Sequence, residues 1–253
     1  MENLKDKLIR EAESLRKKKY LLFFIPISNP DYESSADKFR ELSSLCQTKE
    51  EKLKYLLESV NTYLLNPIEY NRYNAFLIYQ NIAEIYESDS LAIKYFILSG
   101  DMALSCNKEN LAAKSYEKAF EISTNINEKI NLMNKIVQCY NTNSWKHHKQ
   151  NSLKILASLL FENGEYEKAA GNYLLIKSSL YNMCAGICYY LEGVESDLDV
   201  ENEHKKIYES LSKGNEEIKK SVDEYVENNG VDKDVKKVLQ VLLDKMSPEN
   251  DIL

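Results

Sequence analysis

The feature that most constrains this sequence is the absence of proline between residues 68 and 247. Apolar and aromatic residues recur through the same stretch at spacings of three and four, which is the period of an α-helix. A proline inside a helix removes a hydrogen bond and clashes with the preceding turn, so a long proline-free stretch of this periodicity favours consecutive helices. The pattern predicts an all-α protein.

Two neighbouring segments indicate how these helices pack. Residues 91–103 and 111–120 alternate small with aromatic side chains, and Asn107 lies between them. Small residues allow two helix backbones to approach closely, whereas aromatic side chains fill the space between helices. The small residues are Gly100, Ala112, Ala113 and Ala119, and the aromatic ones are Tyr95, Phe96, Tyr116 and Phe120. This arrangement is typical of a TPR-like solenoid of helical hairpins, and such solenoids bind partners.

The composition agrees with this architecture. The chain has few glycines and prolines, while 29% of its residues are charged and 43% are hydrophobic, which favours an ordered, helix-rich protein. A solenoid also accommodates 253 residues in one elongated domain, because each hairpin contacts only its neighbours. The formal net charge of −7 argues against general affinity for nucleic acid, since neutralising phosphates needs a basic surface.

The sequence holds no familiar arrangement for catalysis or metal binding. It contains no glycine-rich phosphate loop, no G-x-S-x-G and no H-E-x-x-H. His147 and His148 are adjacent and so point to different sides of a helix, and His204 has no partner at metal-ligand spacing. The cysteines lack C-x-x-C spacing, which suits reduced thiols in the cytosol, and Cys184 and Cys188 are expected to be buried. We therefore expect no enzymatic activity, no metal and no cofactor.

The N-terminal region combines basic and apolar residues. A helix is expected over about residues 2–19, and the apolar run 20–27 follows it directly. This run is far shorter than the roughly 20 residues that a membrane-spanning helix needs. Two interpretations remain open: the run covers the first helical hairpin, or it forms a membrane-interacting loop at residues 20–30. In the second interpretation, the residues that contact lipid are Leu21, Leu22, Phe23 and Phe24. The basic residues Lys17, Lys18 and Lys19 then bind anionic headgroups.

Periodicity and punctuation predict the remaining helices. They are expected over about 34–46, 49–66, 69–87, 89–106, 108–123, 126–141, 145–163, 179–192, 200–213, 215–228 and 232–246, with a further hairpin beginning at residue 165. Thr48 and Glu51 form a capping box, and Asn163-Gly164 predicts a left-handed helix end. The last helix has one apolar stripe and is expected to cap the fold. Residues 247–253 are expected either to fray or to form a docking peptide.

Four segments of the chain carry a resemblance to a known family. They are Glu11-Ala12-Glu13 with Phe23-Phe24; Asn74-Ala75-Phe76 through Gly100-Asp101 to Ala119-Phe120-Glu121-Ile122; Ala185-Gly186-Ile187-Cys188; and Val222-Asp223-Glu224-Tyr225 with the C-terminal helix and terminus. In this order they resemble the soluble NSF attachment proteins of the alpha-SNAP type, which are adaptors of membrane fusion. The resemblance covers about residues 11–122 and 181–253, and between them the chain is about one hairpin shorter than the family.

The resemblance implies an adaptor that binds assembled SNARE complexes and recruits and stimulates an NSF-type AAA ATPase, which disassembles SNAREs in vesicular transport. It implies an N-terminal solenoid over residues 1–180 and a C-terminal helical domain over residues 181–253. The protein is then expected in the cytoplasm, as a peripheral protein on the cytosolic face of endomembranes, including those of ER–Golgi transport.

The resemblance also suggests which residues meet these partners. The ATPase-stimulating residues are the C-terminal Glu249, Asp251, Ile252 and Leu253, of which Ile252 takes the place of the family's penultimate leucine. The candidates for SNARE binding are Lys94, Lys108, Lys114, Lys118, Lys146, Lys149 and Lys154. For Lys146, Lys149 and Lys154 the ordinary explanation is a solvated helix face. The alternative function is a generic TPR-like scaffold that binds a peptide and has no ATPase partner; an enzyme in an all-helical fold is a third class.

Overall fold

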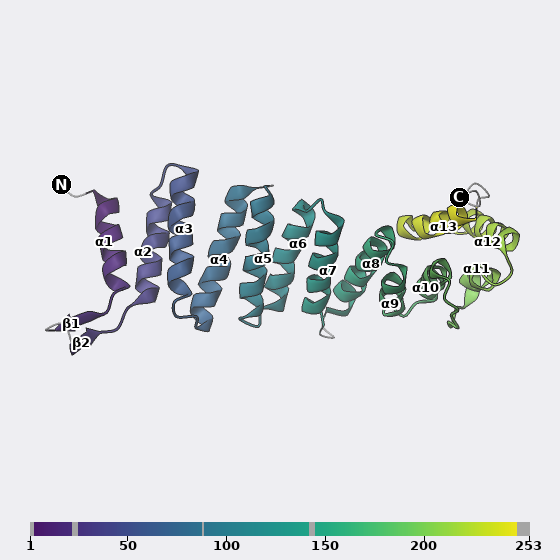
Figure 1. Ribbon diagram of the computed structural model, residues 1–253, viewed down its shortest axis with the longest axis horizontal. Coiled ribbons are helices and arrows are strands. Elements are labelled where there is room, and N and C mark those ends of the chain that lie inside the picture. The colour runs from purple at the N-terminus through teal and green to yellow at the C-terminus, as the bar shows by residue number, and fades with distance from the viewer. Residues whose placement is uncertain (1–2, 22–24, 88, 142–144, 247–253) are drawn as a thin grey trace. The chain divides into compact units, whose positions relative to one another are not determined.

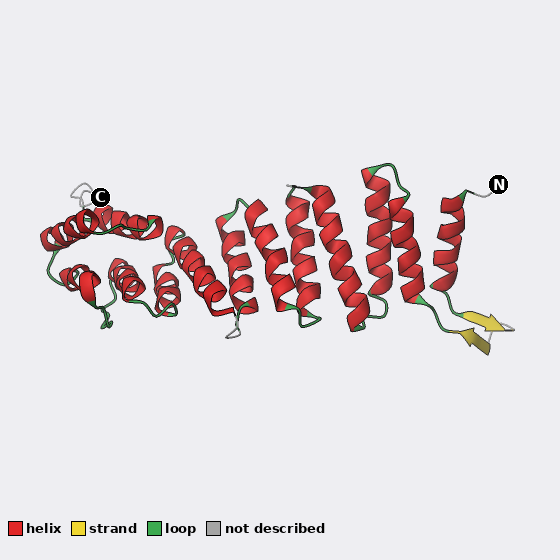
Figure 2. Ribbon diagram, turned by 180° about the vertical axis from the view of Figure 1, so that it is seen from behind, coloured by secondary structure: helices red, strands yellow, loops and turns green. Residues whose placement is uncertain are grey.

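The computed structural model describes residues 3–21, 25–87, 89–141 and 145–246, and the protein is an all-α solenoid of helical hairpins, as predicted (Figure 1). The helices of the first half are α1 (Leu4–Leu15), α2 (Tyr32–Ser44), α3 (Lys49–Tyr63), α4 (Glu69–Tyr86), α5 (Ser90–Leu104) and α6 (Glu109–Ile122). Those of the second half are α7 (Ile126–Cys139), α8 (Lys146–Glu162), α9 (Tyr166–Leu174), α10 (Ser179–Glu192), the 3₁₀ helix η2 (Asn202–His204), α11 (Lys205–Ser210), α12 (Asn215–Asn228) and α13 (Lys233–Lys245). Two short strands, β1 (Lys19–Leu21) and β2 (Ile25–Ser28), lie between α1 and α2 (Figure 2).

The chain divides into two compact units, Met1–Thr124 and Asn125–Leu253. This division differs in position from the boundary expected at residues 180 and 181. The helices α7, α8 and α9 belong to the second unit, and α8 packs against both α7 and α9. The compact units follow from which helices bury one another's apolar faces.

A repeated buried hydrogen bond fixes the spacing of the helices in the first unit. In three helix pairs a buried serine on the later helix donates its hydroxyl to a main-chain carbonyl of the earlier helix. The bonds are Ser35 Oγ to Ala12 O (2.7 Å), Ser59 Oγ to Ala36 O (2.7 Å) and Ser99 Oγ to Phe76 O (3.2 Å). Ala12 and Ala36 are completely buried, so the two backbones approach closely enough for a serine to bridge them.

The contact between α5 and α6 shows the predicted alternation of small and aromatic residues. Tyr116 is completely buried, and its ring lies directly on the backbone of Gly100. The Tyr116 hydroxyl donates a 2.6 Å hydrogen bond to Oδ1 of Asp101. Ala112, Ala113 and Ala119 are also completely buried. The expected role of these small residues at close helix crossings is therefore confirmed.

The same principle operates in the second unit at α10 and α11. The ring of Tyr208 lies on Gly186 and leaves no room for a Cβ atom at that position. The Tyr208 hydroxyl donates to the carbonyl of Ser196 (2.7 Å) and accepts from the main-chain N–H of Leu198 (2.9 Å). One tyrosine thus joins α10, α11 and the irregular segment that connects α10 to η2.

The C-terminal helix α13 packs by its apolar stripe, as expected. The buried residues of this stripe are Val235, Val238, Leu239 and Leu242. Polar contacts hold the helix at both ends: Lys237 pairs with Glu162 of α8, and Lys245 donates to the carbonyl of Leu191 at the end of α10. The helix is therefore fixed to the hairpins of the second unit.

Several predicted helix ends are confirmed, and two differ. Thr48 caps α3 by accepting from the main-chain N–H of Glu51 (3.3 Å), and Gly164 has the left-handed φ of 76° that ends α8. By contrast, α1 ends at Leu15 instead of residue 19. The strands that follow contain Pro26, which a helix does not accommodate. The helix expected over 200–213 is a short 3₁₀ turn followed by the six-residue α11.

Candidate functional site

The apolar run near the N-terminus forms a β-hairpin and not a simple loop. The strands β1 and β2 are antiparallel, with Lys19 opposite Ser28 and Leu21 opposite Ile25. The base of the hairpin is closed because the N–H of Asp31 donates to the carbonyl of Leu15 (2.9 Å). Figure 1 shows the two strands extending from the junction of α1 and α2, beyond the ends of these helices.

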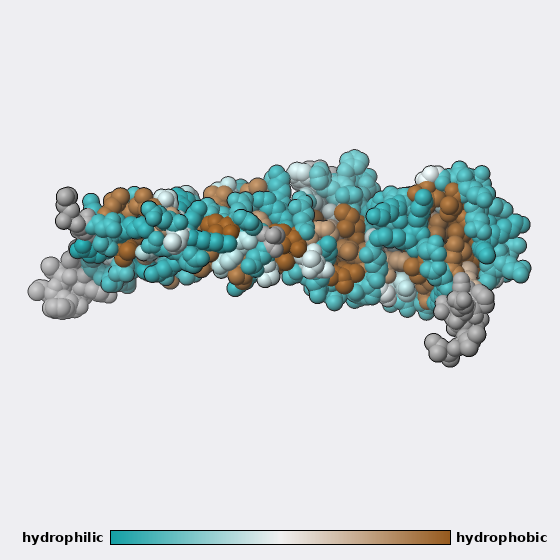
Figure 3. All heavy atoms as spheres, turned by 90° about the horizontal axis from the view of Figure 1, so that it is seen from above, coloured by the Kyte–Doolittle hydropathy of each residue, from teal (hydrophilic) through white to brown (hydrophobic). Residues whose placement is uncertain are grey.

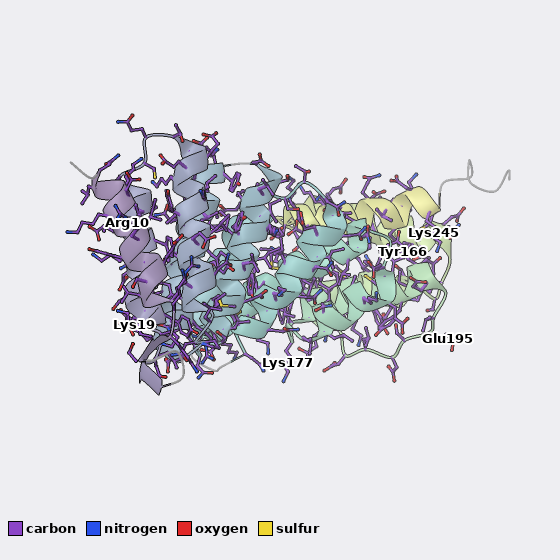
Figure 4. All side chains as sticks on the ribbon, turned by 60° about the vertical axis from the view of Figure 1, so that its left-hand side comes forward. Arg10, Lys19, Tyr166, Lys177, Glu195 and Lys245 are labelled. Atoms are coloured by element: carbon purple, nitrogen blue, oxygen red, sulfur yellow. The ribbon has the colours of Figure 1, made fainter. Side chains whose placement is uncertain are left out.

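Basic residues surround the start of this hairpin. Lys17, Lys18 and Lys19 are exposed, and Lys19 marks the first strand in Figure 4. Arg16 is held differently: its guanidinium pairs with Glu58 of α3 (3.0 Å) and lies over the ring of Phe39, 4.7 Å from the centroid. Arg16 therefore fixes the hairpin to the helices and leaves the three lysines facing solvent.

Of the residues predicted to contact lipid, Leu21 ends β1 and the other three come between the two strands in the sequence. Leu22, Phe23 and Phe24 are outside the described residues, and for Leu21 the structure gives the main chain in β1. The choice between a cover for the first helices and a membrane contact therefore stays a prediction.

The lysines predicted on α5 and α6 differ in their surroundings. Lys118 pairs with Glu84 of α4 (3.0 Å) and lies over the ring of Phe96, while Lys94 lies over the ring of Tyr95. Lys114 is exposed one helical turn before Lys118, so the two share a face, as expected. Within the described part of the first unit, no carboxylate lies within ion-pair distance of Lys94, Lys108 or Lys114. These three lysines are therefore not held in ion pairs within that part of the unit.

Lys108 borders an apolar surface that the sequence analysis missed. Together with Glu69, Tyr70, Tyr73 and Leu111 it lines an open depression of about 570 Å³ between α4 and α6. Tyr70 is 50% exposed and Tyr73 is 37% exposed. The two tyrosines and Leu77 follow one another at helical spacing on the exposed face of α4, and this was the signal available in the sequence. Elsewhere, Figure 3 shows hydrophobic residues in separate patches on a mainly hydrophilic face.

The three lysines predicted on α8 have different roles. Lys146 is exposed at the first position of the helix, and Lys149 donates to Oδ1 of Asn141 (2.7 Å). Lys154 is largely buried and pairs with Asp232 (2.5 Å) and Asp234 (3.8 Å) at the start of α13. The hydrogen bond to Asp232 raises the pKa of Lys154, and the same bond lowers the pKa of Asp232. Lys154 thus joins α8 to α13 and has little charge to offer a partner.

The residues predicted to contact the ATPase follow α13. Glu249, Asp251, Ile252 and Leu253 are outside the described residues. The helix that precedes them is anchored at both ends, as described above.

The buried thiols are chemically quiet. Cys184 and Cys188 are completely buried on α10, as expected, and burial raises the pKa of the Cys184 thiol to about 12. A neutral thiol is a poor nucleophile and a poor metal ligand. In the described ranges, His, Cys, Asp and Glu side chains do not gather in threes or more as they would to hold a metal ion.

None of the helices in the described ranges combines the length and hydropathy needed to cross a bilayer.

A scan against models of known protein families gave no match to this chain, and a search of curated proteins found no similar sequence.

Proposed function

We propose that this protein is an adaptor of the soluble NSF attachment type, which binds assembled SNARE complexes and recruits and stimulates an NSF-type AAA ATPase. One observation carries the proposal: a β-hairpin with three exposed lysines at its start extends from the first two helices of a helical-hairpin solenoid. This combination fits a protein that meets a membrane with one end while its helices meet another protein.

The hairpin is suited to a membrane surface for two physical reasons. Each lysine near an anionic bilayer contributes about 1 kcal/mol of electrostatic attraction, so Lys17, Lys18 and Lys19 together provide a useful but reversible contact. The apolar residues Leu22, Phe23 and Phe24 then add burial in the lipid interface. Holding an adaptor at the membrane raises its effective concentration near membrane-anchored partners without a further protein contact.

The lysines of the first unit provide the contact for a SNARE complex. Lys94, Lys108 and Lys114 are not held in ion pairs within the described part of this unit, whereas Lys118 is paired with Glu84. Charges spread over a solenoid surface attract and orient an acidic helical bundle more than they add raw affinity. Lys146 and Lys149 remain candidates in the second unit, whereas the ion pairs of Lys154 assign it to the fold.

The first test concerns the membrane contact. The double substitution Phe23→Ser and Phe24→Ser is expected to lower binding to anionic liposomes and disassembly of membrane-anchored SNARE complexes. Disassembly of soluble SNARE fragments is expected to change little. The matched control is Leu175→Ser with Val226→Ser, because these apolar residues are 60% and 42% exposed elsewhere on the surface. Equal loss of disassembly in both assays would remove the membrane role.

The second test concerns the adaptor role as a whole. ATP hydrolysis by an NSF-type ATPase with a preformed SNARE complex is measured with and without this protein, alongside a pull-down of the three components. A ternary complex with stimulated hydrolysis is expected. Ile252→Ala is expected to keep SNARE binding and to reduce the stimulation. A well-folded protein that forms no such complex contradicts the proposal.

A second candidate is a peptide-binding scaffold without an ATPase partner. The depression beside Lys108 favours it, because exposed tyrosines flanked by Lys108 and Glu69 suit a peptide that carries both apolar and charged side chains. The ternary-complex assay separates the two candidates, since a scaffold of this kind leaves the ATPase rate unchanged.

A further inference from the structure

Asparagine stands directly before glycine at Asn163-Gly164 and at Asn229-Gly230. This dipeptide is prone to spontaneous deamidation, because glycine has no side chain to hinder attack by its main-chain nitrogen on the carboxamide. The first pair lies at the end of α8 and the second at the end of α12. Both asparagines are half-buried and both glycines are exposed, so accessibility alone does not distinguish the two pairs.

Hydrogen bonds hold the first pair at both reacting atoms. The N–H of Gly164 donates to the carbonyl of Phe161 (3.0 Å). The carboxamide nitrogen of Asn163 donates to Oε1 of Glu165 (2.8 Å) and to Oδ1 of Asn127 (3.2 Å). The attacking nitrogen and the carboxamide under attack are therefore both fixed, and they react only after these three hydrogen bonds open.

The second pair is held by fewer bonds. Neither the carbonyl of Asn229 nor the N–H of Gly230 is hydrogen-bonded to any other described residue. The carboxamide of Asn229 donates from Nδ2 to the carbonyl of Tyr225 (3.0 Å). The main chain at Asn229 is extended, with φ −128° and ψ 143°. The peptide unit between Asn229 and Gly230 is therefore free to turn until its nitrogen reaches the carboxamide carbon.

We propose that Asn229 is a site of spontaneous deamidation in the folded protein and that Asn163 is protected from it. The main-chain nitrogen of Gly230 loses its proton to base and attacks Cγ of Asn229. A new N–C bond forms, the Cγ–Nδ2 bond breaks, and Nδ2 leaves as ammonia. Water then opens the resulting succinimide: attack at the main-chain carbonyl gives isoaspartate, and attack at the side-chain carbonyl gives aspartate. The inference does not rest on the adaptor proposal.

Either product changes the end of α12. The Nδ2 donor to the carbonyl of Tyr225 is lost, and a carboxylate appears beside the last carbonyls of the helix. Negative charge is unfavourable at a helix C-terminus, because the helix dipole already places partial negative charge there. Isoaspartate also adds a methylene group to the main chain that leads to Asp232, which caps α13 and pairs with Lys154. Deamidation is therefore expected to loosen the connection between α12 and α13.

The experiment follows both pairs in one sample. Full-length protein is incubated at mildly alkaline pH in water enriched in a heavy oxygen isotope, and its tryptic peptides are analysed by mass spectrometry over time. The peptide 221–233 reports on Asn229, and the peptide 155–168 reports on Asn163. Isotope incorporation marks conversion during the incubation, and chromatographic separation of isoaspartate from aspartate identifies the succinimide route. A parallel sample in guanidinium chloride measures both rates without the fold.

The ratio of the rate at residue 229 to that at residue 163 is expected to be at least about tenfold larger in the folded protein than in guanidinium chloride, because three hydrogen bonds must open at residue 163. Gly230→Ala should slow the reaction at residue 229 severalfold and leave residue 163 unchanged. This variant is expected to fold, because nothing lies within 4 Å of a Cβ at position 230. A ratio that the fold does not raise, or an unchanged rate at residue 229 in Gly230→Ala, overturns the proposal.

Discussion

Replacing Gly100 by alanine tests the close contact between α5 and α6. A Cβ atom at this position would lie 2.7 Å from Cζ and 2.8 Å from Cδ1 of Tyr116, well inside van der Waals contact. Tyr116 is completely buried and its hydroxyl is bonded to Asp101, so the ring has no free space to enter. The helices must separate, or Tyr116 must leave its site.

The expected magnitude follows from three contributions. Overpacking of a filled core costs about 1–3 kcal/mol, and loss of a hydrogen bond to a carboxylate costs about 1.5–3 kcal/mol. Alanine in place of glycine within a helix stabilises the folded protein by about 1 kcal/mol, which offsets part of this cost. The free energy of unfolding should therefore fall by roughly 1.5–5 kcal/mol, although glycine is the poorer helix former.

Urea unfolding followed by circular dichroism measures this change, and hydrogen exchange of α5 and α6 peptides locates it. Gly171→Ala is the matched control, because nothing lies within 4 Å of a Cβ at this helical position. The control should be stabilised by about 0.5–1 kcal/mol. In a Tyr116→Leu background the cost of Gly100→Ala should shrink, because the ring atoms that clash are gone.

The close contact of Tyr116 with Gly100 is refuted if Gly100→Ala is as stable as the unaltered protein, or gains stability as Gly171→Ala does. It is also refuted if the cost is the same with tyrosine and with leucine at position 116, because the ring would then not be its cause.

Three further predictions concern the second unit and the thiols. Gly186→Ala should displace Tyr208, because a Cβ at position 186 would lie 2.5 Å from the tyrosine ring. Hydrogen exchange in residues 194–200 should then become faster. Unchanged exchange in these residues would contradict the clamp by Tyr208. The hydrogen bond from Lys154 lowers the pKa of Asp232 in the folded protein. The ionised Asp232 therefore stabilises the folded protein at pH values above its unfolded pKa of about 3.9. This stabilisation is lost as the pH falls through the lower pKa of the folded state. Asp232→Asn should therefore reduce the loss of stability on acidification, measured by urea midpoints from neutral to acidic pH, and identical pH profiles would refute this role. Under native conditions iodoacetamide should modify the partly exposed Cys46 well before the buried Cys184, because burial raises the pKa of the Cys184 thiol to about 12. Equal rates of modification, measured by mass spectrometry, would contradict the burial of Cys184 on α10.

Local sequence signals located most helices closely. The segment expected over about 69–87 is helical over Glu69–Tyr86, because Pro67 prevents an earlier start and the apolar spacing continues to its end. The cap by Thr48 and the left-handed Gly164 were also predictable, since each depends on residues only a few positions apart. The run 20–27 was harder, because a short apolar segment suits a strand, a loop or a buried turn equally.

The candidate sites also combine features that nearby residues predict with features that depend on residues far apart in the sequence. The exposed lysines of α6 were predictable from helical spacing, but the engagement of Lys154 was not, because its partner Asp232 lies 78 residues away in the sequence.

The sequence by itself determined that this chain folds as consecutive helices and where most of them begin and end. Those properties follow from hydrogen bonds and side-chain contacts within one or two turns. Only the tertiary structure decided which serine meets which carbonyl and which lysines form ion pairs with carboxylates far away in the sequence. These depend on the packing of one hairpin against the next, which no local pattern encodes.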